Sequence, residues 1–98
     1  MSEALSGKQK RKLRALGHHL QVVVQVGQKG VTTEVLAAVA QALEDHELVK
    51  VKVSADATDD RHAAAEQLAT QTQSGLAQVL GRTVLLYKQR KKNPKIVV

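Results

Sequence analysis

Two short segments rich in β-branched residues enclose a helical segment, and this arrangement constrains the fold most strongly. Residues 21–26 and 48–53 have the composition of strands, and residues 33–44 between them repeat apolar side chains at helical spacing. A strand, a helix and a strand in succession form a parallel pair with a right-handed crossover. We therefore expect helices packed on a sheet, with the valine-rich strand at residues 21–26 largely buried.

A further helix is expected at residues 6–20, ahead of this unit. Ser6 is a suitable N-cap, and the helical period gathers the leucines into one apolar sector. These leucines should hold the helix to the rest of the protein while its basic residues face outward. They are Leu5, Leu13, Leu16 and Leu20.

The second half of the chain adds a third helix and a hairpin. Residues 56–72 are expected to form a helix with two aspartates in its first turn and a thin apolar face. Residues 76–80 and 83–87 are typical of two strands joined by a tight turn at residues 81–82. The whole order is αβαβαββ, which predicts an α/β fold (an α+β sandwich) with three helices and a four-stranded mixed sheet.

The strand expected at residues 48–53 alternates between apolar and basic side chains. Its valines point to one face, and Lys50 and Lys52 point to the other. Such a strand has one packed face and one wet, positive face. The two lysines could extend a cationic surface or could simply keep the outer face of the sheet hydrated.

The length of 98 residues corresponds to one domain, which we place at residues 1–88 with a basic, flexible tail at residues 89–98. Cysteine is absent, which excludes disulfides and thiolate metal ligands and is typical of a reducing compartment. The apolar runs are far shorter than a membrane span, and the N-terminus lacks the apolar core of a signal peptide. We therefore expect a cytoplasmic, monomeric protein that does not insert into membranes.

The charge of the chain is positive and unevenly distributed. The formal net charge is +6, and of the fifteen Lys and Arg residues five lie within residues 8–14 and five within residues 88–95. The acidic residues lie mostly between these two clusters. Segregated positive charge concentrates polyanions, of which nucleic acid is the most common. The alternative is a solvated face that binds nothing.

The sharpest local feature is the pair Gly27 and Gly30, between an expected strand and an expected helix. Glycines leave room for a sugar–phosphate chain to approach the peptide N–H groups, and a helix that starts near Thr32 adds oriented donors. Gln28 and Lys29 lie between the glycines, and Lys29 supplies a charge. An ordinary strand-to-helix turn has the same pattern.

The cationic cluster in the first helix is the second candidate for binding, and its residues could neutralise phosphates. We expect this helix and the glycine loop to meet and to form one docking site, with Lys50 and Lys52 extending it. The alternative is again a solvated helix face, although solvated helices usually mix both signs of charge. The candidate contacts on the helix are Lys8, Lys10, Arg11, Lys12, Arg14 and His18.

No constellation for catalysis or for metal binding is present in the sequence. The four histidines lack the spacing of a helical metal site, and Asp59 and Asp60 are adjacent, so on a helix they point about 100° apart. We therefore predict that the protein is not an enzyme and that it needs no metal, cofactor or small-molecule substrate. There is no Phe or Trp, so only Tyr87 could stack on a base, which favours binding through the sugar–phosphate backbone of a nucleic acid.

Four stretches of the chain resemble the YhbY-type CRM domain (chloroplast RNA splicing and ribosome maturation). They are LSGKQKRKLRALGHHL at residues 5–20, VQVGQKGVT at 24–32, ALEDHELVKVK at 42–52 and GRTVLLY at 81–87. The glycine loop of the family corresponds to Gly27 and Gly30, and its basic helix motif to residues 8–14. Gln28 stands where a basic residue is common, and residues 22–23 lack the proline often found there.

The resemblance implies a fold similar to the C-terminal domain of translation initiation factor three. It also implies a function, because bacterial stand-alone members bind precursors of the large ribosomal subunit and plant relatives act in intron splicing. We therefore expect an RNA-binding protein that holds ribosomal RNA during assembly of the large subunit. The alternatives are a module that binds an acidic protein and, with less support, a small RNA-processing enzyme.

Overall fold

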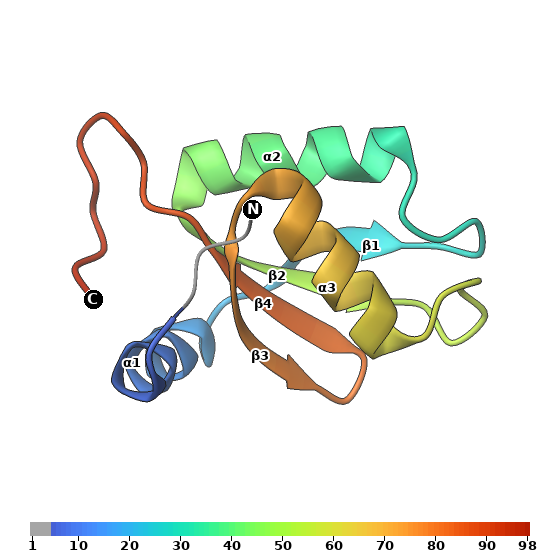
Figure 1. Cartoon of the computed structure of the whole chain (residues 1–98), viewed down its shortest axis with the longest axis horizontal. Helices are drawn as coiled ribbons and strands as arrows, with labels where there is room; N and C mark the ends of the chain where they lie inside the picture. The colour runs from blue at the N-terminus through green and yellow to red at the C-terminus, as the bar shows by residue number, and fades with distance from the viewer. Residues whose placement is uncertain (1–4) are drawn as a thin grey trace.

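The computed structural model describes residues 5–98, which form three helices and one four-stranded sheet (Figure 1). The predicted order αβαβαββ is confirmed; the predicted domain start at residue 1 lies outside the described residues. In chain order the elements are α1 (Gly7–Gly17), β1 (Val22–Val26), α2 (Thr33–His46), β2 (Leu48–Val53), α3 (Arg61–Thr72), β3 (Gly75–Leu80) and β4 (Thr83–Tyr87).

The sheet is mixed, as predicted, and its strands lie in the order β1-β2-β4-β3. β1 and β2 are parallel and are connected through α2, which is the predicted strand–helix–strand unit. β4 is antiparallel to β2 on one side and to β3 on the other, so the terminal hairpin completes the sheet. The two edges are therefore formed by β1 and β3.

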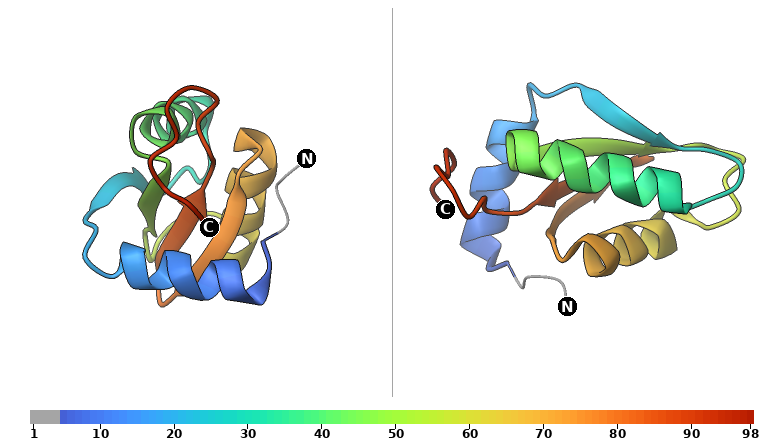
Figure 2. Two further views of the ribbon diagram at one scale, coloured as in Figure 1. Left: turned by 90° about the vertical axis from the view of Figure 1, so that its left-hand side faces the viewer. Right: turned by 90° about the horizontal axis from the view of Figure 1, so that it is seen from above.

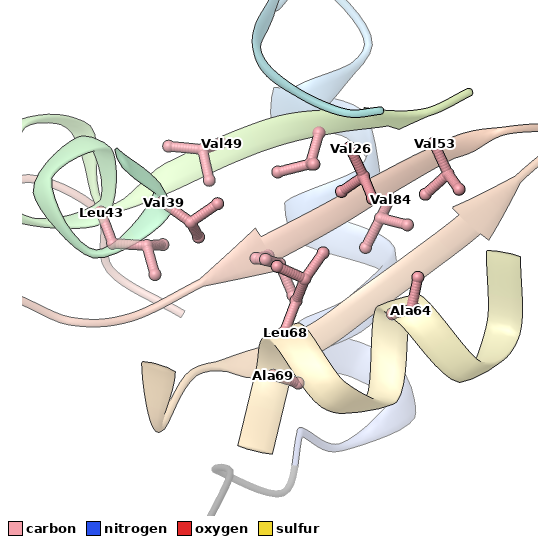
Figure 3. Close-up of a cluster of buried hydrophobic side chains, with 12 residues drawn as sticks. Val26, Val39, Leu43, Val49, Val53, Ala64, Leu68, Ala69 and Val84 are labelled. Carbon is pink, nitrogen blue, oxygen red and sulfur yellow. The ribbon is translucent and has the colours of Figure 1, made fainter. Parts of the chain in front are cut away.

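Helices cover the two faces of the sheet unequally. Figure 2 shows α2 and α3 together on one face and α1 lying across the strands on the other. The larger core lies under α2 and α3, where Val39 and Leu43 of α2 and Leu68 of α3 point toward the valines of the strands (Figure 3). A smaller cluster lies under α1, and it contains Leu13, Leu48, Ala77, Leu85 and Tyr87.

Each helix begins at a side-chain cap. The Ser6 hydroxyl accepts a hydrogen bond from the N–H of Gln9, and the side-chain oxygen of Gln9 accepts one from the N–H of Ser6. This reciprocal pair is a capping box. Thr32 caps α2 by accepting from Val35 N–H at 3.2 Å. Asp60 caps α3 by accepting from two N–H groups, and these bonds lower the pKa of its carboxyl.

Three local expectations were wrong. α3 begins at Arg61 rather than at residue 56, because Asp60 is its cap and residues 54–60 form a loop. β1 is an edge strand with its first residues exposed, so it is not largely buried. The four leucines do not all anchor α1: Leu13 is completely buried and Leu5 packs against the same cluster, whereas Leu16 and Leu20 are 43% and 37% exposed.

Glu47 joins α2 to β2 and is completely buried, which is unusual for a charged side chain. Its φ is 66°, and its carboxylate accepts from the N–H groups of Arg90 at 3.0 Å, Ile96 at 3.1 Å and Lys95. Burial by itself raises the pKa of this carboxyl, but the three N–H donors and the charge of Arg90 outweigh it. The pKa of Glu47 therefore lies below its ordinary value.

The segment at residues 89–98 folds back along the end of the sheet through these contacts (Figure 1). The Tyr87 hydroxyl also donates to the carbonyl of Ile96 at 3.3 Å. The flexibility expected for this segment in solution stays a prediction. None of the helices in the described part of the chain combines the length and apolar character that crossing a membrane requires.

Candidate nucleic-acid interface

The basic residues of α1 lie on the sides of the helix that the sheet leaves free. Leu13 is buried against the sheet, and Gly17 follows one turn later, so close that a Cβ there would lie 2.8 Å from Leu85 Cδ1. Because residues four apart share a helix face, this contact turns the other positions toward solvent. All of the basic residues are exposed except Lys10, which is half-buried. They are Lys8, Lys10, Arg11, Lys12 and Arg14.

The charge of this helix is not compensated locally. No acidic residue lies in α1 or in β1, β2, β3 or β4. None of the five basic side chains makes an ion pair or a hydrogen bond within residues 5–98. A cationic surface free of carboxylates attracts a polyanion over its whole length.

Lys50 and Lys52 continue this surface beyond α1. The alternation along β2 places them on the face that carries Leu48 and the small cluster under α1, opposite the buried valines. Lys50 is half-buried beside Leu85 of β4, and Lys52 is exposed beside Thr83. The lysines therefore lie on the part of the sheet that no helix covers.

The glycine loop is a tight turn at the carboxyl end of β1. Gly30 N–H donates to the carbonyl of Gly27 at 3.0 Å, and Gly30 has φ of +79°, which favours glycine. A Cβ on Gly30 would also lie 3.0 Å from Asp59 Oδ2. Nothing lies within 4 Å of the Cβ position of Gly27, so the approach to that side of the loop is open.

A second loop holds the glycine turn in place. The carbonyl of Gln28 accepts from the N–H of Thr58 at 3.1 Å and from its hydroxyl at 2.6 Å. The side chains of Gln28 and Lys29 are exposed, whereas Thr32 is half-buried and caps α2. The loop therefore presents Lys29 to solvent, but with the carboxylate of Asp59 beside Gly30.

α1 and the glycine loop do not meet, contrary to the expectation of a single docking site where helix and loop join. α1 packs on the start of β2 at Leu48, and the loop lies beside the end of β2 near Val53. Five residue steps of a strand span roughly 16 Å. Figure 2 shows α1 and the loop at opposite ends of the sheet. Lys50 and Lys52 lie on the strand between them, and the strand carries no acidic residue.

His18 and His19 border a cavity between α1 and the uncovered part of the sheet. The cavity has a volume of about 490 Å³, and Arg14, Lys50 and Gln78 also line it. Sequence reasoning selected His18 but missed His19, Gln78 and Thr83. The alternation of side chains along β4 could have predicted that Thr83 lies on the same face as Leu85. Gln78 lies on this face because of an irregularity in β3, which the sequence does not predict.

The other candidate chemistry has no support from the geometry. Within residues 5–98, no three His, Asp or Glu side chains gather where they could hold a metal ion. Tyr87, the one aromatic residue expected to be able to stack on a base, is 2% exposed and lies in the cluster under α1. A bound strand cannot reach the face of its ring.

Fold and surface together define a small α/β domain in which one helix and the open part of a mixed sheet form an uncompensated cationic surface. The chain belongs to the CRS1/YhbY (CRM) domain family, whose model matches residues 5–88. The resemblance inferred from the sequence motifs is thereby confirmed.

Several relatives cover nearly the whole chain. The probable RNA-binding protein YqeI of Bacillus subtilis is 44% identical over 92 residues, which are 94% of this chain and 96% of YqeI. The probable RNA-binding protein PA4753 of Pseudomonas aeruginosa is also 44% identical, over 94% of this chain and 86% of its own. The solution structure of SAV1595 from Staphylococcus aureus has 37% identity and a TM-score of 0.83, and the match covers 96% of this chain and 98% of SAV1595.

Proposed function

We propose that the protein is a cytoplasmic, monomeric RNA-binding protein that holds ribosomal RNA during assembly of the large ribosomal subunit. The observation that carries the proposal is the acid-free surface formed by α1 and β2. On it, the five basic residues of α1 together with Lys50 and Lys52 lack any partner within the described residues. Relatives that cover most of the chain are named as RNA-binding proteins, which supports RNA as the polyanion.

The strand would run from α1 over the open face of the sheet toward the glycine loop. α1 and β2 supply most of the charge, so phosphate contacts there should dominate the affinity. At the far end, the open side of Gly27 lets a sugar–phosphate chain approach the backbone, and Lys29 adds a charge. The carboxylate of Asp59 beside Gly30 repels phosphates, so the glycine loop should contribute less to the RNA affinity than α1 and β2 do.

The ribosomal target is the finer part of the proposal and rests on the family resemblance. Phosphate contacts position a strand but carry no sequence information, so they do not by themselves select one RNA. Selection among cellular RNAs would then come from the shape of the target and from a small number of base contacts. No reaction is part of the proposal, and the protein acts by holding RNA.

The salt dependence of RNA affinity tests the role of α1. If about five phosphates are engaged, log affinity should fall against log salt with a slope near −3.5 for a single strand. Changing Lys8, Arg11 and Arg14 together to Gln removes three of these contacts and should bring the slope to roughly −1.4. Fluorescence anisotropy at several salt concentrations measures both slopes.

A matched comparison separates the surface from net charge. Arg11→Gln on α1 and Arg61→Gln on α3 remove the same charge, but α3 lies on the opposite face of the sheet (Figure 2). The first should flatten the slope by about 0.7 and the second should leave it unchanged. Equal effects of the two variants, or an unchanged slope in the triple variant, would show that α1 is not the contact surface.

A further inference from the structure

The cavity beside α1 has the lining of a site for a flat polar ligand. Its apolar floor is formed by Leu85 and by the exposed Leu80, and its polar groups are Gln78 and Thr83. Its volume of about 490 Å³ falls within the range of roughly 300–1,000 Å³ typical of small-ligand pockets. The cavity opens on the same uncovered face of the sheet that carries Lys50.

The charge around this cavity is positive on two sides. Arg14 comes from α1 and Lys50 from β2, and no carboxylate lies in its lining. A second hollow at the opposite end of the sheet has a similar size, but there the charges of Arg61 and Arg82 are offset by Asp59 and Asp60. Of these two, only the cavity beside α1 suits a ligand attached to phosphates.

Two imidazoles form flat walls in the cavity. The rings of His18 and His19 have centroids 5.4 Å apart and planes 81° apart, so the two walls meet at nearly a right angle. Bases of single-stranded RNA stack on histidine as well as on larger aromatic rings. Because Tyr87 is buried and the sequence holds no Phe or Trp, His18 and His19 are the rings in the lining of this cavity on which a base could stack.

Gln78 and Thr83 supply groups that could pair with the edge of a base. Neither side chain makes a hydrogen bond within the described residues 5–98. An amide offers both a donor and an acceptor, and a hydroxyl offers either. Both residues are only half-buried, so their polar groups can reach a ligand without a change in the fold.

We propose that this cavity holds one unpaired base of the RNA strand, stacked on the imidazoles of His18 and His19 and hydrogen-bonded to Gln78 and Thr83. Arg14 and Lys50 bind the phosphates on either side of that base. The inference rests on the proposed RNA binding and adds a base-contacting site to it. It predicts that the protein, although it has no exposed Phe, Tyr or Trp, prefers single-stranded RNA with bases over a bare phosphate chain.

The test compares two oligoribonucleotides of the same length, roughly ten residues, one of mixed sequence and one abasic. The natural protein should bind the mixed-sequence strand about fivefold to tenfold tighter, with the same salt slope for both strands. The variant with His19→Ala and Gln78→Ala should lose most of this preference, because one stacking ring and one hydrogen-bonding side chain are gone. Its salt slope should be unchanged, because no charge contact is lost.

The control variant carries the same two kinds of substitution on α3, His62→Ala with Gln71→Ala, on the opposite face of the sheet. It should keep the preference for the strand with bases. Thermal melting of both variants checks that the fold is intact, since all four side chains are exposed or half-buried.

The outcomes separate this inference from the proposed function. If the natural protein binds both strands equally, or if the cavity variant keeps the preference, the base contact is elsewhere and the inference is wrong. In either case salt-dependent RNA binding would still stand. If neither strand binds with a salt-dependent affinity, the proposed function fails and the inference fails with it.

Discussion

At the scale of single residues, the two glycines of the loop have different roles. Gly30 is buried, has a left-handed backbone and lies against Asp59, so its lack of a Cβ is a requirement of the fold. Gly27 has free space around it, so no contact within residues 5–98 demands a glycine there. A glycine without a structural reason is the better candidate for close approach by a ligand.

Substituting each glycine by alanine separates stability from binding. Gly30→Ala should lower the free energy of unfolding by about 1–2 kcal/mol, because an L-residue is strained in that conformation. For a domain of this size the melting temperature should fall by about 4–8 °C per kcal/mol. Gly27→Ala should change stability by less than about 0.5 kcal/mol and weaken RNA binding. Equal losses of stability would contradict this division.

Glu47 is the residue whose environment differs most from what its sequence neighbours suggest. Glu44 and Asp45 beside it are exposed, whereas the carboxylate of Glu47 is out of contact with solvent under residues 90–96. Its pKa in the folded state is below the ordinary value of 4.5. A carboxyl with a lowered pKa stabilises the fold above its unfolded pKa, and the gain is lost as pH falls through the folded pKa.

Stability should therefore decrease below about pH 4.5 in a way that depends on Glu47. In Glu47→Gln the side-chain NH₂ group faces a backbone N–H, and two donors cannot form a hydrogen bond with each other. The substitution should therefore lower the free energy of unfolding by about 1–3 kcal/mol at neutral pH. The same variant should lose less stability than the natural protein on acidification. Glu44→Gln, an exposed control on α2, should change neither the stability at neutral pH nor its loss on acidification. Urea denaturation at pH 7 and pH 3.5 measures both effects.

At the scale of elements, α1 is held to the sheet by fewer contacts than its sequence suggests. Four leucines share its apolar sector, but the helix ends at Gly17, so Leu20 falls outside it. Leu13 is its one fully buried leucine, and Gly17 brings the helix backbone onto Leu85. Leu5, just before the helix, packs against the same cluster but is only half-buried, so the most basic element of the protein depends mainly on Leu13 for its attachment.

Leu13→Ala should therefore lower the free energy of unfolding by about 2–5 kcal/mol, because replacing a completely buried leucine by alanine leaves a cavity. Leu16→Ala should cost less than about 1 kcal/mol, because Leu16 is 43% exposed. Chemical denaturation of both variants measures the difference. Similar losses would mean that the leucines share the anchoring after all, as the sequence pattern suggests.

At the scale of the whole molecule, the cationic residues form a line rather than a patch. The line starts at α1 and continues along β2 with Lys50 and Lys52. It ends at the glycine loop, which carries Lys29 and lies at the end of the sheet opposite α1 (Figure 2). A line of this kind suits an extended single strand, since successive phosphates can each meet a cation. A compact acidic protein would use only part of it.

Sedimentation of cell extract tests the target at this scale. If the protein holds ribosomal RNA during assembly, it should migrate with precursors of the large subunit, and nuclease treatment should release it. The triple variant at Lys8, Arg11 and Arg14 should shift to the top of the gradient. A protein that stays with its partner after nuclease treatment would instead support the alternative of an acidic protein partner.

The sequence alone determined the element order, the starts of α1 and α2 and the sign of the surface. These depend on neighbours in the chain: Ser6 and Thr32 cap helices that begin one residue later, and the alternation at residues 48–53 separates valines from lysines. The family also followed from local motifs, because each motif lies within one stretch of chain.

Only the tertiary structure decided which distant residues share a surface. It placed α1 and the glycine loop at opposite ends of the sheet, buried Glu47 under the C-terminal segment and brought His19, Gln78 and Thr83 to one cavity. The physical reason is that strand order, and the position at which a helix crosses a sheet, depend on packing between segments far apart in sequence. Local periodicity shows which side of an element is apolar, but not which element will cover it.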